Sequence, residues 1–238
     1  MHTRNKNNTN ITSSLTINGG EISVYLNSLT WVSNIKLIKA LSRRAYLFLK
    51  TTNLDPDNFI EVSEQELKKI SSLKTPNKVI ALFKIPVEKN SSPSGLIVAL
   101  DAINDPGNLG TIIRLCDWFG IDQLLCSKET VDCYNTKVVQ SSMGSLTRVA
   151  ISYIDLKEYL TSVSIPVFIE DMDGDNIYEM MPPTSAVLVM GNEANGISNS
   201  IKQIVSTKIT IPRYGNSQLT ESLNVATATA ILLSEFRR

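Results

Sequence analysis

Polar side chains that could do chemistry gather in three short segments of this 238-residue chain. The first segment contains Asn108 and Arg114, the second contains Glu193, and the third contains Ser222 and Asn224. Each segment follows an apolar run that is typical of a buried strand. In open α/β sheets, ligands bind outside the carboxyl ends of the strands, and unpaired N–H groups at helix starts attract anions. The pattern therefore predicts one ligand-binding site that is built from three loops.

Each segment also has an ordinary structural explanation when it is taken alone. Asn108 can cap a helix, and Arg114 then lies on the helix surface about one and a half turns later. A single carboxylate after a strand, such as Glu193, is usually a turn former or a helix cap. Capping explains only one of the two polar residues Ser222 and Asn224. The combination of the three segments favours a functional site.

The composition argues against several classes of enzyme. The single histidine is His2, so the commonest general base and metal ligand is missing from the part that is predicted to fold. Ser-His-Asp hydrolysis, Cys-His proteolysis and histidine-ligated zinc are therefore disfavoured, and we expect no metal cofactor. The segment around Asn108 is neither a Walker loop nor a GxGxxG fingerprint, because it has no Gly-Lys-Ser/Thr sequence.

Residues 95–238 contain the predicted elements that position these segments. Short apolar runs predict strands over residues 96–100, 123–126, 148–153, 167–170, 186–190 and 209–211. Helical patterns over residues 109–119, 134–143 and 156–163 alternate with these runs, and the chain ends in an Ala/Leu-rich helix. This alternation predicts an α/β fold, with a mainly parallel sheet that has helices on both faces.

The first part of the chain predicts a small and less regular structure. Residues 1–25 are rich in Asn, Thr and Ser and are expected to form a disordered leader. Residues 26–88 are expected to form an α/β module of roughly 50 residues, close to the lower limit for independent stability. Its predicted elements are a basic helix over 31–45, strands over 46–49 and 78–84, and a helix over 67–73 behind a capping box at 63–66.

Charge is unevenly distributed, although the formal net charge is +0. Residues 1–94 contain 13 lysines and arginines against 7 aspartates and glutamates, whereas residues 95–238 contain 10 against 16. The basic part favours contact with phosphate groups, but a solvated basic surface explains its charge equally well. The candidate phosphate contacts on the predicted basic helix are Lys36, Lys39, Arg43 and Arg44.

Cysteine usage and hydropathy indicate where in the cell the protein is expected to work. Cys116, Cys126 and Cys133 lack paired spacing and are expected to be reduced, structural thiols. No apolar run approaches the roughly 18–20 residues that cross a bilayer, and the first twenty residues lack the apolar segment of a signal peptide. We therefore expect a cytoplasmic protein that does not associate with a membrane.

The three polar segments resemble the three signature motifs of the SpoU/TrmH family of RNA ribose 2′-O-methyltransferases, in the SPOUT superfamily. Residues 108–114 are similar to the first motif, Asn-x-Gly-x-x-x-Arg. Residues 188–193 resemble the second motif, and Ile211–Pro212 together with residues 222–226 resemble the third. Order, spacing and strand context all agree, and the resemblance covers roughly residues 95–238.

The resemblance implies a fold and an activity that the spacing alone does not. It implies a C-terminal trefoil knot, a homodimer with active sites close to the subunit interface, and methyl transfer from S-adenosylmethionine to a ribose 2′-hydroxyl in structured ribosomal or transfer RNA. The implied cofactor-binding residues are Gly191, Ile211 and Leu223. The implied polar active-site residues are Asn108, Arg114, Glu193, Ser222 and Asn224.

The sequence departs from the family pattern in three places. Ala194 follows Glu193 where the family usually has glycine, and alanine disfavours a positive φ. The loop between Ile211 and Leu223 is slightly longer than usual and adds Arg213 as a candidate RNA contact. The front module fits only part of the RNA-binding domain that many family members carry.

Two other functions stay open on the sequence alone. The shortened front module is compatible with an RNA-binding protein that keeps this fold but has lost turnover. An unrelated nucleotide-binding α/β protein is a third hypothesis, although the chain lacks the expected phosphate loop.

Overall fold

The computed structural model describes residues 35–40, 59–71, 79–83, 95–121, 123–215 and 222–238. The chain divides into two compact units. One comprises residues 1–87 with residues 134–140, and the other comprises residues 88–133 with residues 141–238. The predicted leader and the strand predicted over residues 46–49 lie outside the described residues.

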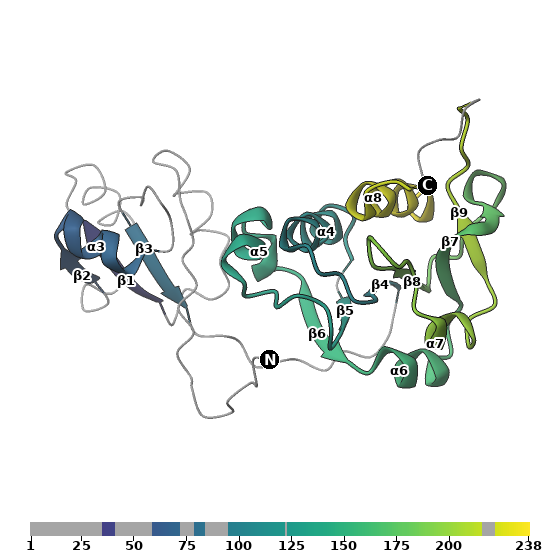
Figure 1. Ribbon diagram of the computed structural model, residues 1–238, viewed down its shortest axis with the longest axis horizontal. Helices are drawn as coiled ribbons and strands as arrows, with labels where there is room; N and C mark the ends of the chain where they lie inside the picture. Colours follow the sequence, from purple (N-terminus) through teal and green to yellow (C-terminus); the bar gives the residue numbers. More distant parts are fainter. Residues whose placement is uncertain (1–34, 41–58, 72–78, 84–94, 122, 216–221) are drawn as a thin grey trace. The chain divides into compact units, whose positions relative to one another are not determined.

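Residues 1–87 of the first unit contain, in their described part, a three-stranded sheet and one helix (Figure 1). The strands are β1 (Ile35–Ala40), β2 (Phe59–Val62) and β3 (Val79–Phe83), and the helix is α3 (Glu64–Ile70). β1 is central, parallel to β2 and antiparallel to β3. The strand predicted over 78–84 is confirmed, whereas β2 was not predicted.

The capping box predicted at residues 63–66 is confirmed. The Oγ atom of Ser63 accepts a hydrogen bond from the backbone N–H of Glu66 at 3.3 Å, and Glu66 Oε2 accepts one from the backbone N–H of Ser63 at 2.8 Å. Ser63 Oγ also donates to Glu66 Oε2 at 2.7 Å, and this hydrogen bond, together with the one from the backbone N–H of Ser63, lowers the pKa of Glu66. Because Ser63 is the cap, the helix begins directly after it and spans 64–70, three residues earlier than predicted.

The basic helix predicted over residues 31–45 is wrong. The chain instead forms strand β1 over Ile35–Ala40, while Arg43 and Arg44 lie outside the described residues. The apolar spacing fitted a helix face, but the segment also contains β-branched Ile35 and Ile38, which favour strands. Pairing with strands on both sides decided the structure, and the sequence of the segment does not reveal those partners.

The second unit contains a six-stranded sheet in which every neighbouring pair is parallel. The strand order is β6-β5-β4-β8-β7-β9. The strands are β4 (Leu96–Leu100), β5 (Gln123–Ser127), β6 (Ala150–Ile154), β7 (Val167–Asn176), β8 (Ala186–Met190) and β9 (Lys208–Thr210). The predicted α/β class and parallel sheet are therefore confirmed for this unit.

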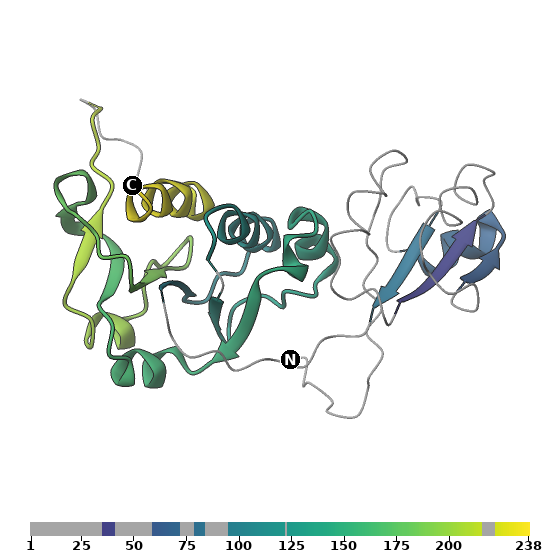
Figure 2. The same cartoon turned by 180° about the vertical axis from the view of Figure 1, so that it is seen from behind.

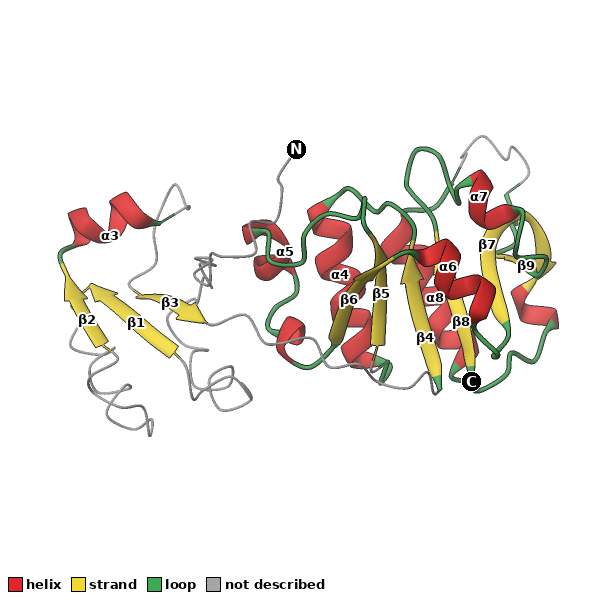
Figure 3. Ribbon diagram, turned by 90° about the horizontal axis from the view of Figure 1, so that it is seen from below, coloured by secondary structure: helices red, strands yellow, loops and turns green. Residues whose placement is uncertain are grey.

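Helices cover both faces of this sheet (Figures 2 and 3). On one face lie α4 (Pro106–Trp118) and α8 (Val225–Phe236), and Phe168 of β7 meets Phe236 of α8 edge to face with ring centroids 5.4 Å apart. On the other face lie α6 (Leu156–Ser162) and α7 (Asn199–Lys202), which pack on the buried side chains Ile97, Ala99, Val187 and Val189. Shorter elements are α5 (Thr136–Ser141), η3 (Ser145–Thr147) and η4 (Ile177–Glu179).

Two central strands are buried on both faces. Every residue of β4 and β8 is buried, which is why both read as continuous apolar runs rather than as alternating patterns. Their carboxyl ends lie at the same edge of the sheet because the two strands are parallel, with Leu100 opposite Met190. The two loops that leave this edge therefore begin side by side.

Helices α4 and α8 run in the same direction and are joined near both ends. Near their starts, the Nδ2 atom of Asn224 donates a hydrogen bond to Oδ1 of Asn108 at 2.9 Å. Near their ends, the guanidinium group of Arg237 donates to the carbonyl oxygens of Phe119 at 2.9 Å and Gly120 at 2.8 Å. Both helices thus begin at the carboxyl edge of the sheet.

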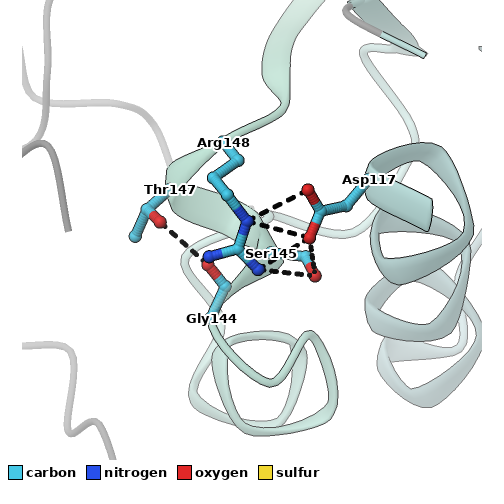
Figure 4. A network of polar contacts seen from close by, with 5 residues as sticks. All are labelled: Asp117, Gly144, Ser145, Thr147 and Arg148. Atoms are coloured by element: carbon cyan, nitrogen blue, oxygen red, sulfur yellow. Dashed lines mark hydrogen bonds and ion pairs between the residues drawn. The ribbon is translucent and has the colours of Figure 1, made fainter. Parts of the chain in front are cut away.

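An ion pair fixes the turn η3 to the last part of α4 (Figure 4). Arg148 donates from Nε and Nη2 to the carboxylate of Asp117, with Nη2 to Oδ2 at 2.6 Å, and Ser145 Oγ donates to the same Oδ2 at 2.7 Å. The hydrogen bond from Arg148 is the main reason that the pKa of Asp117 lies below its usual range. The anchor holds the part of α4 that follows Arg114.

Candidate functional site

The first polar loop connects β4 to α4, and Asp105 rather than Asn108 caps the helix. Asp105 Oδ1 accepts from the backbone N–H of Asn108 at 2.8 Å, and Pro106 occupies the first turn. Proline suits this position because its missing N–H would have no helical partner there. The capping role suggested for Asn108 is therefore wrong, and its side chain is available for contacts with other loops.

The second polar loop follows β8 and is held tightly around Gly191. A Cβ atom at residue 191 would lie 2.4 Å from the carbonyl carbon of Gly196 and 2.4 Å from the nitrogen of Ile197, so only glycine fits. The backbone groups of Asn192 and Gly196 bond to each other at 3.0 and 2.8 Å. Ala194 is not among the described non-glycine residues with a positive φ, so the alanine is accommodated without strain.

The third polar loop leads into α8, and Asn224 is its N-cap. Asn224 Oδ1 accepts from the backbone N–H groups of Ala226 at 3.0 Å and Thr227 at 3.2 Å. This leaves the amide Nδ2 of Asn224 to donate elsewhere. Ser222 and Leu223, which precede the cap, are both exposed.

The three loops meet through a chain of side-chain hydrogen bonds, here called the polar triad (Asn108, Glu193 and Asn224). Asn224 Nδ2 donates to Asn108 Oδ1 at 2.9 Å, and Asn108 Nδ2 donates to Glu193 Oε1 at 2.8 Å. These residues are 116 and 85 positions apart in the sequence. The structure therefore brings together one predicted residue from each of the three segments.

Further hydrogen bonds tie the first two loops together. Asp101 Oδ2 accepts from the backbone N–H of Ser198 at 2.7 Å, and Asn192 Nδ2 donates to the carbonyl oxygen of Ala102 at 2.7 Å. The N–H of Ala102 donates to Ser127 Oγ at 3.0 Å. Ala102 is held at φ 57°, a left-handed conformation that costs a non-glycine residue about 1 kcal/mol.

The positioning residues Asp101, Ser127 and Asn192 were not predicted as part of the site. Each stands at the carboxyl end of a buried strand, at the last residue of the strand or one or two positions after it. A polar residue at such a position was the available signal, because a buried polar group there needs a partner from a neighbouring loop.

Arg114 lies on α4 but outside the polar triad. It is exposed and takes no part in the hydrogen bonds between Asn108, Glu193 and Asn224. Arg114 lies six positions after Asn108 on the helix, which places the two side chains about 120° apart around the helix axis and about 9 Å apart along it. Within one chain, Arg114 and the triad therefore occupy different faces of the helix.

The predicted cofactor-binding residues also stand at the carboxyl edge. Gly191 directly follows β8, Ile211 directly follows β9, and Leu223 lies two residues before α8. Gly191 is buried, Ile211 is half-buried, and the exposed fraction of Leu223 is 49%. Their assignment to a cofactor stays a prediction.

The predicted RNA contacts are only partly described. Lys36 and Lys39 lie in β1 of the first unit, whereas Arg43 and Arg44 lie outside the described residues. Arg213 is exposed just after β9, and its Nη2 lies 3.1 Å from the sulfur of Met172.

The three cysteines are buried thiols outside any disulfide bond, as the sequence predicted. Burial raises the pKa of the Cys116 and Cys126 thiols, which keeps both in the unreactive thiol form. Within the described ranges, no group of three His, Cys, Asp or Glu side chains is placed to hold a metal ion. None of the described helices has the length and apolar character needed to span a membrane.

Comparison with known proteins gives relatives in sequence and in structure. A Bacillus subtilis enzyme, the 23S rRNA (guanosine(2553)-2′-O)-methyltransferase RlmP, is 31% identical over 180 residues, which are 74% of this chain and 71% of that enzyme. An RNA methyltransferase of the TrmH family from Porphyromonas gingivalis has a TM-score of 0.79 and 35% identity, covering 93% of this chain and 88% of that chain. An AdoMet-bound rRNA methyltransferase from Sinorhizobium meliloti has a TM-score of 0.74 and 27% identity, covering 94% and 87%.

The family match spans the region that contains the polar triad. The SpoU rRNA Methylase family matches residues 95–234, which include all three polar loops and nearly all of α8. The resemblance drawn from residues 108–114, 188–193 and 222–226 is thereby confirmed. The chain belongs to the SpoU rRNA Methylase family.

Proposed function

We propose that this chain is an RNA 2′-O-ribose methyltransferase that uses S-adenosylmethionine. The observation that carries the proposal is the polar triad, which joins Asn108, Glu193 and Asn224 from three distant segments at one edge of the sheet. The family match over residues 95–234 and the named activity of the Bacillus subtilis relative support it. That relative acts on 23S rRNA, so ribosomal RNA is the first substrate class to test, and transfer RNA is the second.

The carboxyl edge offers a fitting place for the cofactor. Gly191 has no room for a side chain, and the polypeptide on either side of it forms a narrow turn whose backbone can contact a ligand. Gly191, Ile211 and Leu223 would hold S-adenosylmethionine there. When bound, the cofactor supplies an electrophilic methyl group on a sulfonium sulfur.

The polar triad is suited to positioning the ribose hydroxyl. The Asn108 amide is fixed in one orientation, because its oxygen accepts from Asn224 while its nitrogen donates to Glu193. The hydrogen bond from Asn108 Nδ2 also holds the Glu193 carboxylate in place. Alignment of the hydroxyl with the methyl group supplies a large part of the rate in such transfers. Exposed Ser222, two residues before Asn224, would assist in this alignment.

Arg114 is assigned to an RNA phosphate. Its guanidinium group is exposed, and an arginine side chain holds its proton too tightly to act as a base at neutral pH. A planar guanidinium instead binds phosphate through paired hydrogen bonds.

We further propose that the chain works as a homodimer. Trp118 and Arg114 lie four residues apart on α4, on one helix face, and the exposed fraction of Trp118 is 85%. An aromatic side chain this exposed is typical of a subunit contact. Covering Trp118 with a second subunit would place Arg114 close to the interface, where it can complete the partner's site.

Three finer features follow from the same family membership. We propose that the C-terminal part of the second unit forms a trefoil knot, that residues 26–88 act as a shortened RNA-binding module, and that the protein works in the cytoplasm with its cysteines reduced. The family match over residues 95–234 supports the knot, and the structural match to the Porphyromonas gingivalis protein, which covers 93% of this chain, supports the module.

Tritium transfer from labelled S-adenosylmethionine to 23S rRNA tests the activity. We expect transfer by the unaltered protein, and loss of transfer in Arg114→Ala with cofactor affinity nearly unchanged in calorimetry. Lys157→Ala, an exposed cation on α6, is the matched control. Cofactor binding without transfer to rRNA or tRNA would instead favour an RNA-binding protein that has lost turnover.

Mixing two inactive variants tests the shared site. If Arg114 serves the partner's triad, then Arg114→Ala and Glu193→Gln combined in one solution regain activity in mixed dimers, up to about one quarter per site in a statistical mixture. No regain after subunit exchange would place Arg114 in its own subunit's site.

A further inference from the structure

The loop that follows β9 carries a large and highly exposed aromatic side chain beside a cation. Arg213 and Tyr214 stand three and four residues after the last residue of β9, and the exposed fraction of Tyr214 is 81%. Met172 of β7, with an exposed fraction of 58%, lies beside Arg213, since its sulfur is 3.1 Å from Nη2 of Arg213. The guanidinium group that contacts this thioether, together with the exposed aromatic ring of the next residue, is here called the β9 platform.

We propose that the β9 platform (Met172, Arg213 and Tyr214) stacks on an unpaired base of the RNA substrate. Every base has a π-face, and aromatic rings and arginine planes stack on such faces without regard to sequence. The polarizable sulfur of methionine also makes favourable contacts with aromatic rings. The proposal rests on the proposed function, because it assigns a role toward RNA.

The place of the platform in the fold suits a base near the reacting ribose. β9 is parallel to β7, and β7 is parallel to β8, so the loops after β8 and β9 leave the same edge of the sheet. Glu193 of the polar triad stands in the first of these loops, and Tyr214 stands in the second. The loop with Tyr214 also contains Ile211, which is assigned to the cofactor.

Backbone irregularity explains why Met172 is exposed within a strand. Glu170 and Asp175 of β7 both pair with Ile209 of β9, so residues 171–174 leave the regular ladder between them. Gly174 makes this possible, because a Cβ atom there would lie 2.4 to 2.7 Å from the backbone of Ile209. Met172 therefore projects from a bulge rather than from a continuous ladder.

The charges around the platform favour a base over a phosphate. Asp173 and Asp175 are exposed on the same segment as Met172, and their carboxylates repel a phosphate group. The carboxylate of Asp171 is already neutralised by Lys202 at 2.8 Å and Lys208 at 3.3 Å. An uncharged base face is therefore the part of RNA that this surface accepts.

Binding of short RNA probes tests the platform without turnover. The probes are a labelled single-stranded 12-nucleotide oligoadenylate and a 12-base-pair RNA duplex, measured with full-length Tyr214→Ala, Tyr214→Phe and the unaltered protein. Because one stacked base contributes a factor of about 5 to 150 in affinity, we expect Tyr214→Ala to weaken single-strand binding within that range. Tyr214→Phe retains the ring and should bind within about twofold of the unaltered protein, and duplex binding should not change.

Controls separate stacking from other roles of Tyr214. Tyr178→Ala removes another exposed tyrosine, in η4, and should leave single-strand binding unchanged. The slope of log affinity against log salt should stay the same in Tyr214→Ala, because no phosphate contact is lost. Equal weakening of duplex and single strand, a loss in Tyr214→Phe as large as in Tyr214→Ala, or a change in oligomeric state would each overturn the proposal.

Failure of this inference and failure of the proposed function give different results. If the unaltered protein transfers no methyl group to RNA, the proposed function fails, while the comparison of single-strand binding still decides the platform. If transfer occurs and Tyr214→Ala binds the single strand normally, only the platform fails.

Discussion

The amide group of Asn108 is the most constrained part of the candidate site. Its oxygen accepts from Asn224 and its nitrogen donates to Glu193, so the oxygen and the nitrogen of one amide each form a hydrogen bond with a different residue. The sequence located all three residues, because each follows a buried strand or starts a helix, but it also left helix capping open as an explanation for Asn108. Asp105 caps the helix instead, because α4 begins at Pro106, directly after Asp105. Which side chain caps and which reaches out depends on a backbone turn, and residue types alone do not determine it.

Asn108→Asp tests this amide with almost no change in shape. The new carboxylate replaces the donor to Glu193, so two negative charges face each other and the shared hydrogen bond is lost. Removing one positioned donor from an active site costs about 10²- to 10³-fold in kcat, and we expect a loss of that size in tritium transfer at saturating cofactor.

The matched control for Asn108→Asp is Asn195→Asp, which adds the same charge to an exposed residue of the Glu193 loop. We expect the control to retain its activity, and the affinity of both variants for the cofactor to change little. Normal turnover in Asn108→Asp would remove the triad from the mechanism.

At the scale of elements, strands that are buried on both faces were predictable from the sequence. Strands whose position and length depend on pairing with distant segments were less predictable. The sequence located β4 and β8 to the residue, because strands buried on both faces read as unbroken apolar runs. β7 extends six residues beyond its predicted end through the acidic stretch 171–176, because pairing with β9 resumes after the bulge. The segment around Ile35 and Ile38 became a strand rather than a helix for the same reason, since its partners are distant in sequence.

The ion pair between Asp117 and Arg148 gives α4 a stability that depends on pH. The pKa of Asp117 is lowered in the folded chain, so its contribution is present above the unfolded pKa of about 4 and is lost as the pH falls through the lower folded value. We expect Asp117→Asn to reduce the free energy of unfolding by about 1 kcal/mol at pH 7, because the pair is partly exposed.

Urea unfolding at a series of pH values measures this contribution. The difference between Asp117→Asn and the unaltered protein should shrink as the pH falls below about 4. Asp173→Asn, an exposed carboxylate of β7, serves as the control. A difference that stays constant with pH would assign the loss to packing rather than to charge.

Gly174 permits the close approach of β7 and β9. A Cβ atom at residue 174 would lie 2.4 to 2.7 Å from the backbone atoms of Ile209, so the strands must separate to accept it. We expect Gly174→Ala to lower the free energy of unfolding by about 1 to 3 kcal/mol in urea titrations.

The matched control for Gly174→Ala is Gly215→Ala, whose added Cβ atom would meet nothing within 4 Å. Surface substitutions of this kind change stability by no more than about 0.5 kcal/mol. Equal effects of the two substitutions would contradict the close approach at Ile209.

At the scale of the whole molecule, the chain separates basic and acidic charge. The positive excess lies in residues 1–94, whereas residues 95–238, which contain the polar triad, carry a negative excess. The unit that contains the triad is therefore poorly suited to attract RNA by charge alone. We infer that capture of RNA depends on the first unit and that chemistry depends on the second.

Replacing Lys36, Lys39, Arg43 and Arg44 together by glutamine tests whether the first unit captures RNA while the second unit does the chemistry. Each lost phosphate contact reduces the slope of log affinity against log salt by about 0.7 to 0.9, so we expect a clearly flatter salt dependence of RNA binding. Cofactor affinity should be unchanged, because these residues belong to the first unit. An unchanged slope would mean that the basic residues only contact solvent.

The pairing of α4 with α8 connects the far ends of two helices to the candidate site. The guanidinium group of Arg237 donates hydrogen bonds to the carbonyl oxygens of Phe119 and Gly120, and these bonds oppose a shift of α8 along α4. A shift by one residue is about 1.5 Å along a helix, which is enough to break the contact between Asn224 and Asn108. The two hydrogen bonds of Arg237 therefore help to hold a contact that lies eleven or more residues away, at the other end of the paired helices.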